Sequence, residues 1–166
     1  KELIIKTCKK LRGSLILRIS VQSMDKKVLK NINRDNISEE GMMELAPTIK
    51  ESGLQTHAEV ILGLPGDTYD GHLNTLKTLL NAEIDEILVF TCMLLPGSEM
   101  FEERKKWGLK TKHRILPRDF AKLSNGKIVI ETEEVVISSN TMTFDEYVKL
   151  RLFNFLLSVT NMDIAY

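Results

Sequence analysis

The pattern of hydrophobic and polar positions divides the chain into short apolar runs and longer segments with helical periodicity. Three apolar runs have the length of strands: residues 15–21, 57–62 and 86–91. They alternate little, which is typical of strands covered on both faces of a sheet. Helical spacing follows each run, so we expect parallel strands joined by right-handed crossovers. Three such strands cannot close a barrel, which predicts part of a larger α/β sheet.

Local end signals define the helices between these strands. Asp25 begins a short helix over residues 25–33, and Ser38 begins a second that ends at Gly53. Pro47 lies inside the second helix, where we expect a kink or a break. Three further helices are expected: one over residues 2–11, one beginning at Asp67 or Thr68, and a charged one from the turn at 95–98 to about Trp107.

The pattern changes after Gly108. Residues 127–137 alternate as a strand or small hairpin does, and Thr143 to Val159 predict a final helix. An apolar stripe on that helix is expected to pack on the α/β part: Phe144, Val148, Leu152 and Phe155, extended by Leu156 and Val159. We therefore divide the chain into an α/β segment, 1–107, and a small α+β extension, 108–166.

Composition narrows the classes of function. The 166 residues suit one domain, and 23 basic residues balance 23 acidic ones, which argues against nucleic acid or anionic membrane binding by charge. No apolar run is long enough to span a bilayer, and we expect no signal peptide. Two cysteines, Cys8 and Cys92, lack metal-ligand spacing and suit a reducing, cytoplasmic setting. The chain begins without methionine, so we expect a piece of a longer protein.

Polar residues near the carboxyl ends of the strands are the candidates for chemistry, because ligands bind there in parallel α/β sheets. Gln22 could hydrogen-bond ligand hydroxyls or cap its own loop. Arg34 could hold a carboxylate through a bidentate fork, although a solvated arginine is the commoner outcome. Glu59 lies in an apolar strand, so it either pairs with a cation or accepts hydrogen bonds from a ligand, and we favour the second.

The Gly-Leu-Pro-Gly loop at residues 63–66 is weaker evidence. Its glycines permit unusual backbone angles and close approach. The loop is not a GxGxxG motif and lacks the lysine of a phosphate-binding loop. By itself it predicts only a strand-to-helix turn. The three histidines have no metal spacing, and we expect structural or solvated roles for them.

Four segments in order resemble the second half of a radical S-adenosylmethionine (radical SAM) enzyme. They are SVQS at 20–23, VLKNINRDN at 28–36, AEVILGLPGDT at 58–68 and LLPGSEM at 94–100. The resemblance covers roughly residues 14–107 and implies part of a (β/α)6 partial TIM-like barrel. The most similar subgroup includes cobalamin-binding radical enzymes, methylthiotransferases and the oxygen-independent coproporphyrinogen oxidase. The tail is most similar to the cobalamin-associated members.

The resemblance also implies roles for particular residues. Gln22 and Glu59 would meet the ribose hydroxyls of S-adenosylmethionine, and Glu59 stands where relatives usually have aspartate. Arg34 matches the arginine that reads the methionine carboxylate. Ile61 would pack on adenine, and backbone near Met93 would close the pocket. These residues bind the cofactor, and the resemblance assigns no catalytic residue to this chain.

The cluster motif of the family, CxxxCxxC, is absent from this sequence. Because its three thiolates hold the four-iron four-sulfur cluster, we expect the ligands in a missing N-terminal half of the parent domain. The intact parent, in which cobalamin is a further expected cofactor, would cleave S-adenosylmethionine reductively to a 5′-deoxyadenosyl radical. The chain alone would be inactive. Two alternatives stay open: a cluster-free α/β nucleotide-binding module, or a structural half-barrel that forms homo-oligomers through its open sheet edge.

Overall fold

A computed structural model describes residues 16–51 and 53–160, together with Leu3, Lys6, Thr7 and Lys10. The helix predicted over residues 2–11 therefore lies largely outside the described residues, and so does Cys8. No helix within the described part is long and apolar enough to cross a membrane.

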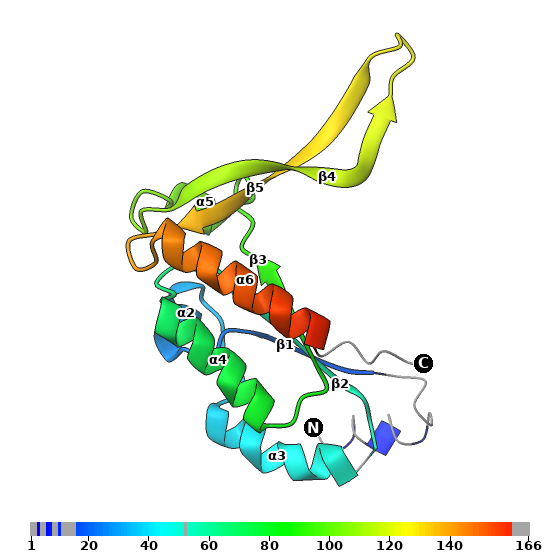
Figure 1. Ribbon diagram of the computed structural model, residues 1–166, viewed down its shortest axis with the longest axis vertical. Coiled ribbons are helices and arrows are strands. Elements are labelled where there is room, and N and C mark those ends of the chain that lie inside the picture. The colour runs from blue at the N-terminus through cyan, green and yellow to red at the C-terminus, as the bar shows by residue number, and fades with distance from the viewer. Residues whose placement is uncertain (1–2, 4–5, 8–9, 11–15, 52, 161–166) are drawn as a thin grey trace.

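A parallel three-stranded sheet lies at the centre of the α/β part, with the strand order β1-β2-β3. The strands are β1 (Leu17–Gln22), β2 (Thr56–Leu62) and β3 (Glu86–Thr91). The crossovers contain α2 (Lys26–Asn31), α3 (Glu39–Glu51) and α4 (Tyr69–Asn81) (Figure 1). The α/β class and the parallel pairing are confirmed. The wider partial barrel stays a prediction.

Most of the helix caps predicted from the sequence are confirmed. The Asp25 carboxylate accepts hydrogen bonds from the first turn of α2, and the Ser38 hydroxyl accepts one from Gly41 at the start of α3. Thr68 is the N-cap of α4, because its hydroxyl accepts from the amide of Gly71. Pro47 does not break the chain into two helices, since α3 runs through it.

The two faces of the sheet differ, which corrects the prediction that the strands are covered on both. Val21, Ala58 and Val60 are fully buried and pack on α3 and α4. On the opposite face, Ser20 is exposed and Phe90 is 51% exposed. Apolar residues such as Phe90 stand on this open face, so the sequence does not alternate clearly even though the burial does.

The helix that follows β3 is shorter than predicted. Helix α5 spans only Glu99–Glu102, and turns follow to Gly108. The Glu103 carboxylate accepts hydrogen bonds from the Lys106 ammonium and the Trp107 indole within these turns.

Two antiparallel strands then form a long hairpin, β4 (Lys110–Lys122) and β5 (Ile128–Ser138), that projects from the molecule (Figure 1). The sequence predicted the second strand and missed the first. The hairpin base is part of the α/β core, because Val136 is buried in one cluster with Val28, Leu64 and Cys92. The domain division at 107/108 stays a prediction.

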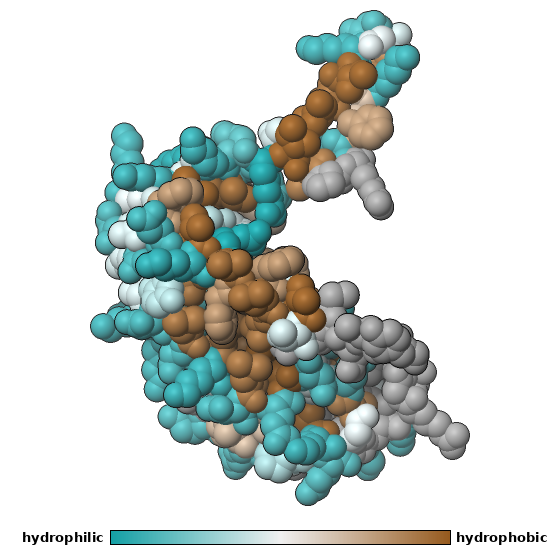
Figure 2. Space-filling view, in the orientation of Figure 1, coloured by the Kyte–Doolittle hydropathy of each residue, from teal (hydrophilic) through white to brown (hydrophobic). Residues whose placement is uncertain are grey.

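The last helix, α6 (Phe144–Thr160), forms where it was predicted but buries another face. Its buried residues are Tyr147, Leu150, Asn154 and Leu157. The predicted stripe from Phe144 to Val159 is exposed and belongs to the apolar surface visible in Figure 2. The prediction was wrong because α6 is apolar nearly all round and buries a polar residue: the Asn154 amide lies 3.3 Å from Nε2 of buried His72 on α4.

Candidate functional site

A cavity of about 330 Å³ opens at the carboxyl ends of the three parallel strands. Four of the five residues proposed as cofactor ligands from the sequence line it: Gln22, Glu59, Ile61 and Met93. They come from β1, from β2 and from the segment after β3, and the parallel pairing brings their strand ends together. The cavity lies where α/β sheets usually bind ligands.

Gln22 ends β1 in an unusual conformation. Its φ of 56° lies in the left-handed region, and the pairing with β2 is irregular between Ser20 and Gln22. Its side-chain oxygen Oε1 is buried and has no hydrogen-bond partner. An unpaired buried acceptor costs about 1–3 kcal/mol. Strained backbone and an unpaired acceptor at one cavity wall favour a role in binding a donor from a ligand over capping of the local loop.

Glu59 pairs with a cation, one of the two roles that its sequence position left open, and the other role, binding a ligand, stays a prediction. The Ser20 hydroxyl donates a 2.8 Å hydrogen bond to Oε2, and the Arg18 guanidinium lies 3.7 Å from Oε1. The Glu59 side chain remains 22% exposed and lines the cavity. Since an ionised carboxylate has about four acceptor sites, it retains capacity to accept hydrogen bonds from ligand hydroxyls.

The rest of the cavity wall is largely apolar. Ile61 and Phe90 are register partners on β2 and β3 and form a continuous patch. Met93 adds its side chain, and its backbone pairs with Val135 of the hairpin. An apolar wall beside two polar acceptors suits a ligand with a flat ring and a hydroxylated part.

The Gly-Leu-Pro-Gly loop is a structural turn next to this cavity. Gly66 has a φ of 83°, and a Cβ there would lie 2.4 Å from the side-chain nitrogen of Asn31. The Gly63 amide donates to the buried carboxylate of Asp67 at 3.3 Å. These contacts fix the end of β2, and hence the positions of Glu59 and Ile61.

Arg34 is not brought to the cavity. It lies after α2, is exposed, and lines a separate hollow with residues such as Lys30 and Asn36. Conversely, sequence reasoning missed Arg114, which reaches the cavity from β4. Its sequence neighbourhood, Lys-His-Arg-Ile, has no local feature that predicts contact with the distant strand ends.

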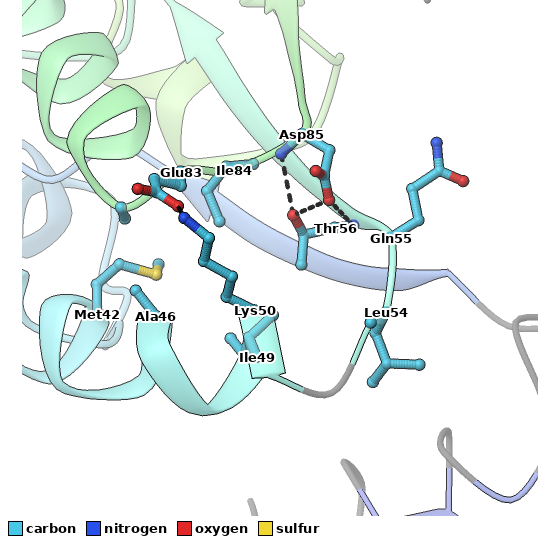
Figure 3. Close-up of a pocket in the computed structure, with 12 residues that line it drawn as sticks. Met42, Ala46, Ile49, Lys50, Leu54, Gln55, Thr56, Glu83, Ile84 and Asp85 are labelled. Carbon is cyan, nitrogen blue, oxygen red and sulfur yellow. Dashed lines mark hydrogen bonds and ion pairs between the residues drawn. The ribbon is translucent and has the colours of Figure 1, made fainter.

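Another hollow lies at the opposite, amino-terminal ends of β2 and β3 (Figure 3). The Asp85 carboxylate accepts hydrogen bonds of 2.7 Å from both the amide and the hydroxyl of Thr56, and Lys50 pairs with Glu83. These polar groups satisfy one another. Because the amino-terminal face of a barrel-like sheet contributes stability and not chemistry, we assign this hollow a structural role.

The described residues contain no candidate metal site. Within the described residues, no group of three His, Cys, Asp or Glu side chains could hold a metal ion. The thiol of Cys92 is buried, and desolvation, aided by the charge of Asp67, raises its pKa to about 12. A thiol that stays protonated is a poor nucleophile, so Cys92 acts as an apolar core residue.

Comparison with known proteins relates the chain to a family. The chain is 28% identical over 144 residues to the cobalamin-dependent radical SAM methyltransferase TokK of Streptomyces tokunonensis. It is 28% identical over 129 residues to the ribosomal protein uS12 methylthiotransferase RimO of Trichlorobacter lovleyi. The chain is a radical SAM homologue.

A solved structure agrees with this relationship. The archaeal Elp3 of Methanocaldococcus infernus matches 64% of the chain with a TM-score of 0.54 and 25% identity. No protein-family model matches the chain. The alignment with TokK covers 85% of this chain and 21% of TokK. The alignment with RimO covers 73% of this chain and 28% of RimO. The chain thus spans less than a third of each curated relative.

Proposed function

We propose that this chain forms one wall of the S-adenosylmethionine site of a radical SAM enzyme. The observation that supports the proposal is the common cavity of Gln22, Glu59, Ile61 and Met93. The family resemblance assigns these four residues to one ligand, and they come from three separate strand ends.

The chemistry of the cavity fits the adenosyl part of the ligand. A ribose diol offers two hydroxyl donors, which the unpaired Oε1 of Gln22 and the Glu59 carboxylate would accept. Ile61 and Phe90 would cover the adenine ring. In a complete enzyme the cofactor, cleaved reductively, supplies the radical chemistry, and the protein groups here bind and orient it.

The iron–sulfur cluster needs ligands that this chain does not have. Its sequence holds two cysteines, fewer than the three thiolates of the family motif. We propose that the cluster ligands belong to residues outside this sequence, which would complete the barrel beside β1, the outer strand of the described sheet. The chain alone would then bind the cofactor without cleaving it. The involvement of cobalamin rests on the likeness to TokK and stays a prediction.

Binding of S-adenosylmethionine to the purified chain tests the proposal. Saturation-transfer NMR detects weak complexes, and isothermal titration gives the affinity. Loss of a hydrogen bond to a charged group costs about 1.5–3 kcal/mol, so Glu59→Ala should weaken binding about 10-fold to 100-fold. Gln22→Ala should weaken it less, because its acceptor is neutral.

Glu83→Ala is the matched control, because Glu83 lies at the opposite end of the sheet. Equal affinity of the parent, Gln22→Ala and Glu59→Ala chains would contradict the proposal. Adenosine monophosphate that binds as tightly as S-adenosylmethionine, with the same dependence on Glu59, would favour a nucleotide-binding module instead.

A further inference from the structure

We propose that Arg114, delivered by the β4–β5 hairpin, binds an anionic group of the ligand that occupies the strand-end cavity. The inference rests on the proposed function and adds a residue that the family motifs do not supply. Two ligands could provide the anion: S-adenosylmethionine, through its carboxylate, or a separate anionic substrate.

The position of Arg114 is fixed by backbone pairing between the hairpin and the segment after β3. The Leu94 amide donates to the carbonyl of Glu134 at 2.8 Å, and the Val136 amide donates to the carbonyl of Cys92 at 2.9 Å. Strand β5 therefore continues the cavity wall beyond β3. Strand β4 pairs with β5 in turn, and this register sets Arg114 opposite Glu133.

Buried contacts at the hairpin base hold this arrangement. Val136 and Cys92 share one core cluster and are almost fully buried. The Glu134 carboxylate accepts hydrogen bonds from both the Thr111 hydroxyl and the Arg104 guanidinium. Because the base is anchored on both strands, Arg114 is presented to the cavity by an ordered part of the hairpin.

The guanidinium of Arg114 has donors to spare. Its Nε donates to the Glu133 carboxylate, whose side chain is 12% exposed, whereas the Arg114 side chain is 48% exposed. An arginine carries five N–H donors, and a contact through Nε leaves the two terminal nitrogens available as a fork. A planar fork matches a carboxylate bidentately. Glu133 would thus orient Arg114 while leaving one edge of it for a ligand.

The charges around the cavity are complementary to a zwitterionic ligand. Glu59 gives the β2 wall a negative group for hydroxyl donors, and Arg114 gives the hairpin wall a positive one. Arg34, the other candidate for the anion, lines a different hollow. Of these two arginines, only Arg114 shares a cavity with Gln22 and Glu59.

Two ligands and three variants test the inference. The ligands are S-adenosylmethionine and 5′-methylthioadenosine, which has the same nucleoside but no carboxylate. The variants are Arg114→Gln, Glu59→Ala and the control Lys112→Gln, which removes a charge from an exposed position on the same strand. The Arg114 side chain is 48% exposed, and glutamine keeps an amide N–H donor for Glu133, so Arg114→Gln should melt within about 4 °C of the parent.

We expect Arg114→Gln to weaken S-adenosylmethionine binding about tenfold or more and to leave methylthioadenosine binding unchanged. Lys112→Gln should change neither. Equal weakening of both nucleosides would assign Arg114 a structural role and overturn the inference. If Glu59→Ala weakens S-adenosylmethionine binding while Arg114→Gln changes the affinity of neither S-adenosylmethionine nor a free carboxylate such as succinate, the inference fails and the proposed function stands.

An anionic substrate as the source of the charge gives a different result. Arg114→Gln would then bind S-adenosylmethionine and methylthioadenosine with the same affinities as the parent chain. It would bind free carboxylates such as succinate more weakly than the parent does. A free carboxylate could bind through Arg114 while Glu59→Ala leaves S-adenosylmethionine affinity unchanged. That result would support the role of Arg114 and contradict the proposed function. No saturable binding of any of these ligands to the parent chain would overturn both.

Discussion

The packing of α6 gives a sharp quantitative prediction. Leu150 is 0% exposed and packs with Leu62, Met142 and Tyr147, whereas Leu152, two residues later, is 61% exposed. Leu150→Ala should cost about 2–5 kcal/mol, because it removes buried methyl groups and leaves a cavity. For a chain of this size each kcal/mol lowers Tm by about 2–4 °C, so a loss of about 3 kcal/mol predicts a drop of roughly 6–12 °C.

Leu152→Ala is the matched control, since it removes the same atoms from an exposed position. Its free energy of unfolding should stay within about 0.5 kcal/mol of the parent value. Urea denaturation followed by circular dichroism gives both free energies, and thermal melts give both midpoints. A larger loss for Leu152→Ala than for Leu150→Ala would refute the packing and restore the stripe predicted from the sequence.

Three further predictions follow from local contacts. The pKa of Glu134 is lowered, mainly because its carboxylate accepts a hydrogen bond from the Thr111 hydroxyl. The ionised carboxylate therefore stabilises the fold above its unfolded pKa of about 4.3. This stabilisation is lost as the pH falls through the lower pKa of the folded state. Denaturation from pH 7 to 3 should therefore show a smaller acid loss for Thr111→Val; an equal loss argues against it. Cys92 should resist iodoacetamide at pH 8 until urea is added, by peptide mass spectrometry, and rapid native labelling would contradict its raised pKa. Gly66→Ala should cost at least about 1–2 kcal/mol, because of its positive φ and the close Asn31 amide, and an unchanged melt would be inconsistent with that turn.

The sequence predicted the α/β part well because its signals are local. The Asp25 and Ser38 caps and the three apolar runs define helices and strands without knowledge of the rest of the chain. Strand β4 was missed because its base is polar and is stabilised by pairing with β5, whose own partner is the distant segment at Leu94.

Some residues of the candidate site could likewise be predicted from the sequence and others could not. Gln22 and Glu59 could be nominated from sequence because the carboxyl ends of parallel strands meet at one edge of a sheet. Arg114 could not, because its place at the cavity depends on the tertiary register between the hairpin and the end of β3. The face of α6 was equally undetermined, since a helix with apolar residues nearly all round has no single hydrophobic stripe.

Chemical-shift mapping with S-adenosylmethionine tests the proposed cofactor wall most directly. In a titration of the ¹⁵N-labelled chain, the largest amide shifts should fall at the strand-end cavity, at Gln22, Glu59, Ile61 and Met93. Amides of the opposite hollow, such as Thr56, should not move. Saturable shifts confined to that opposite hollow, or no shifts at millimolar cofactor, would contradict the assignment of this cavity to S-adenosylmethionine.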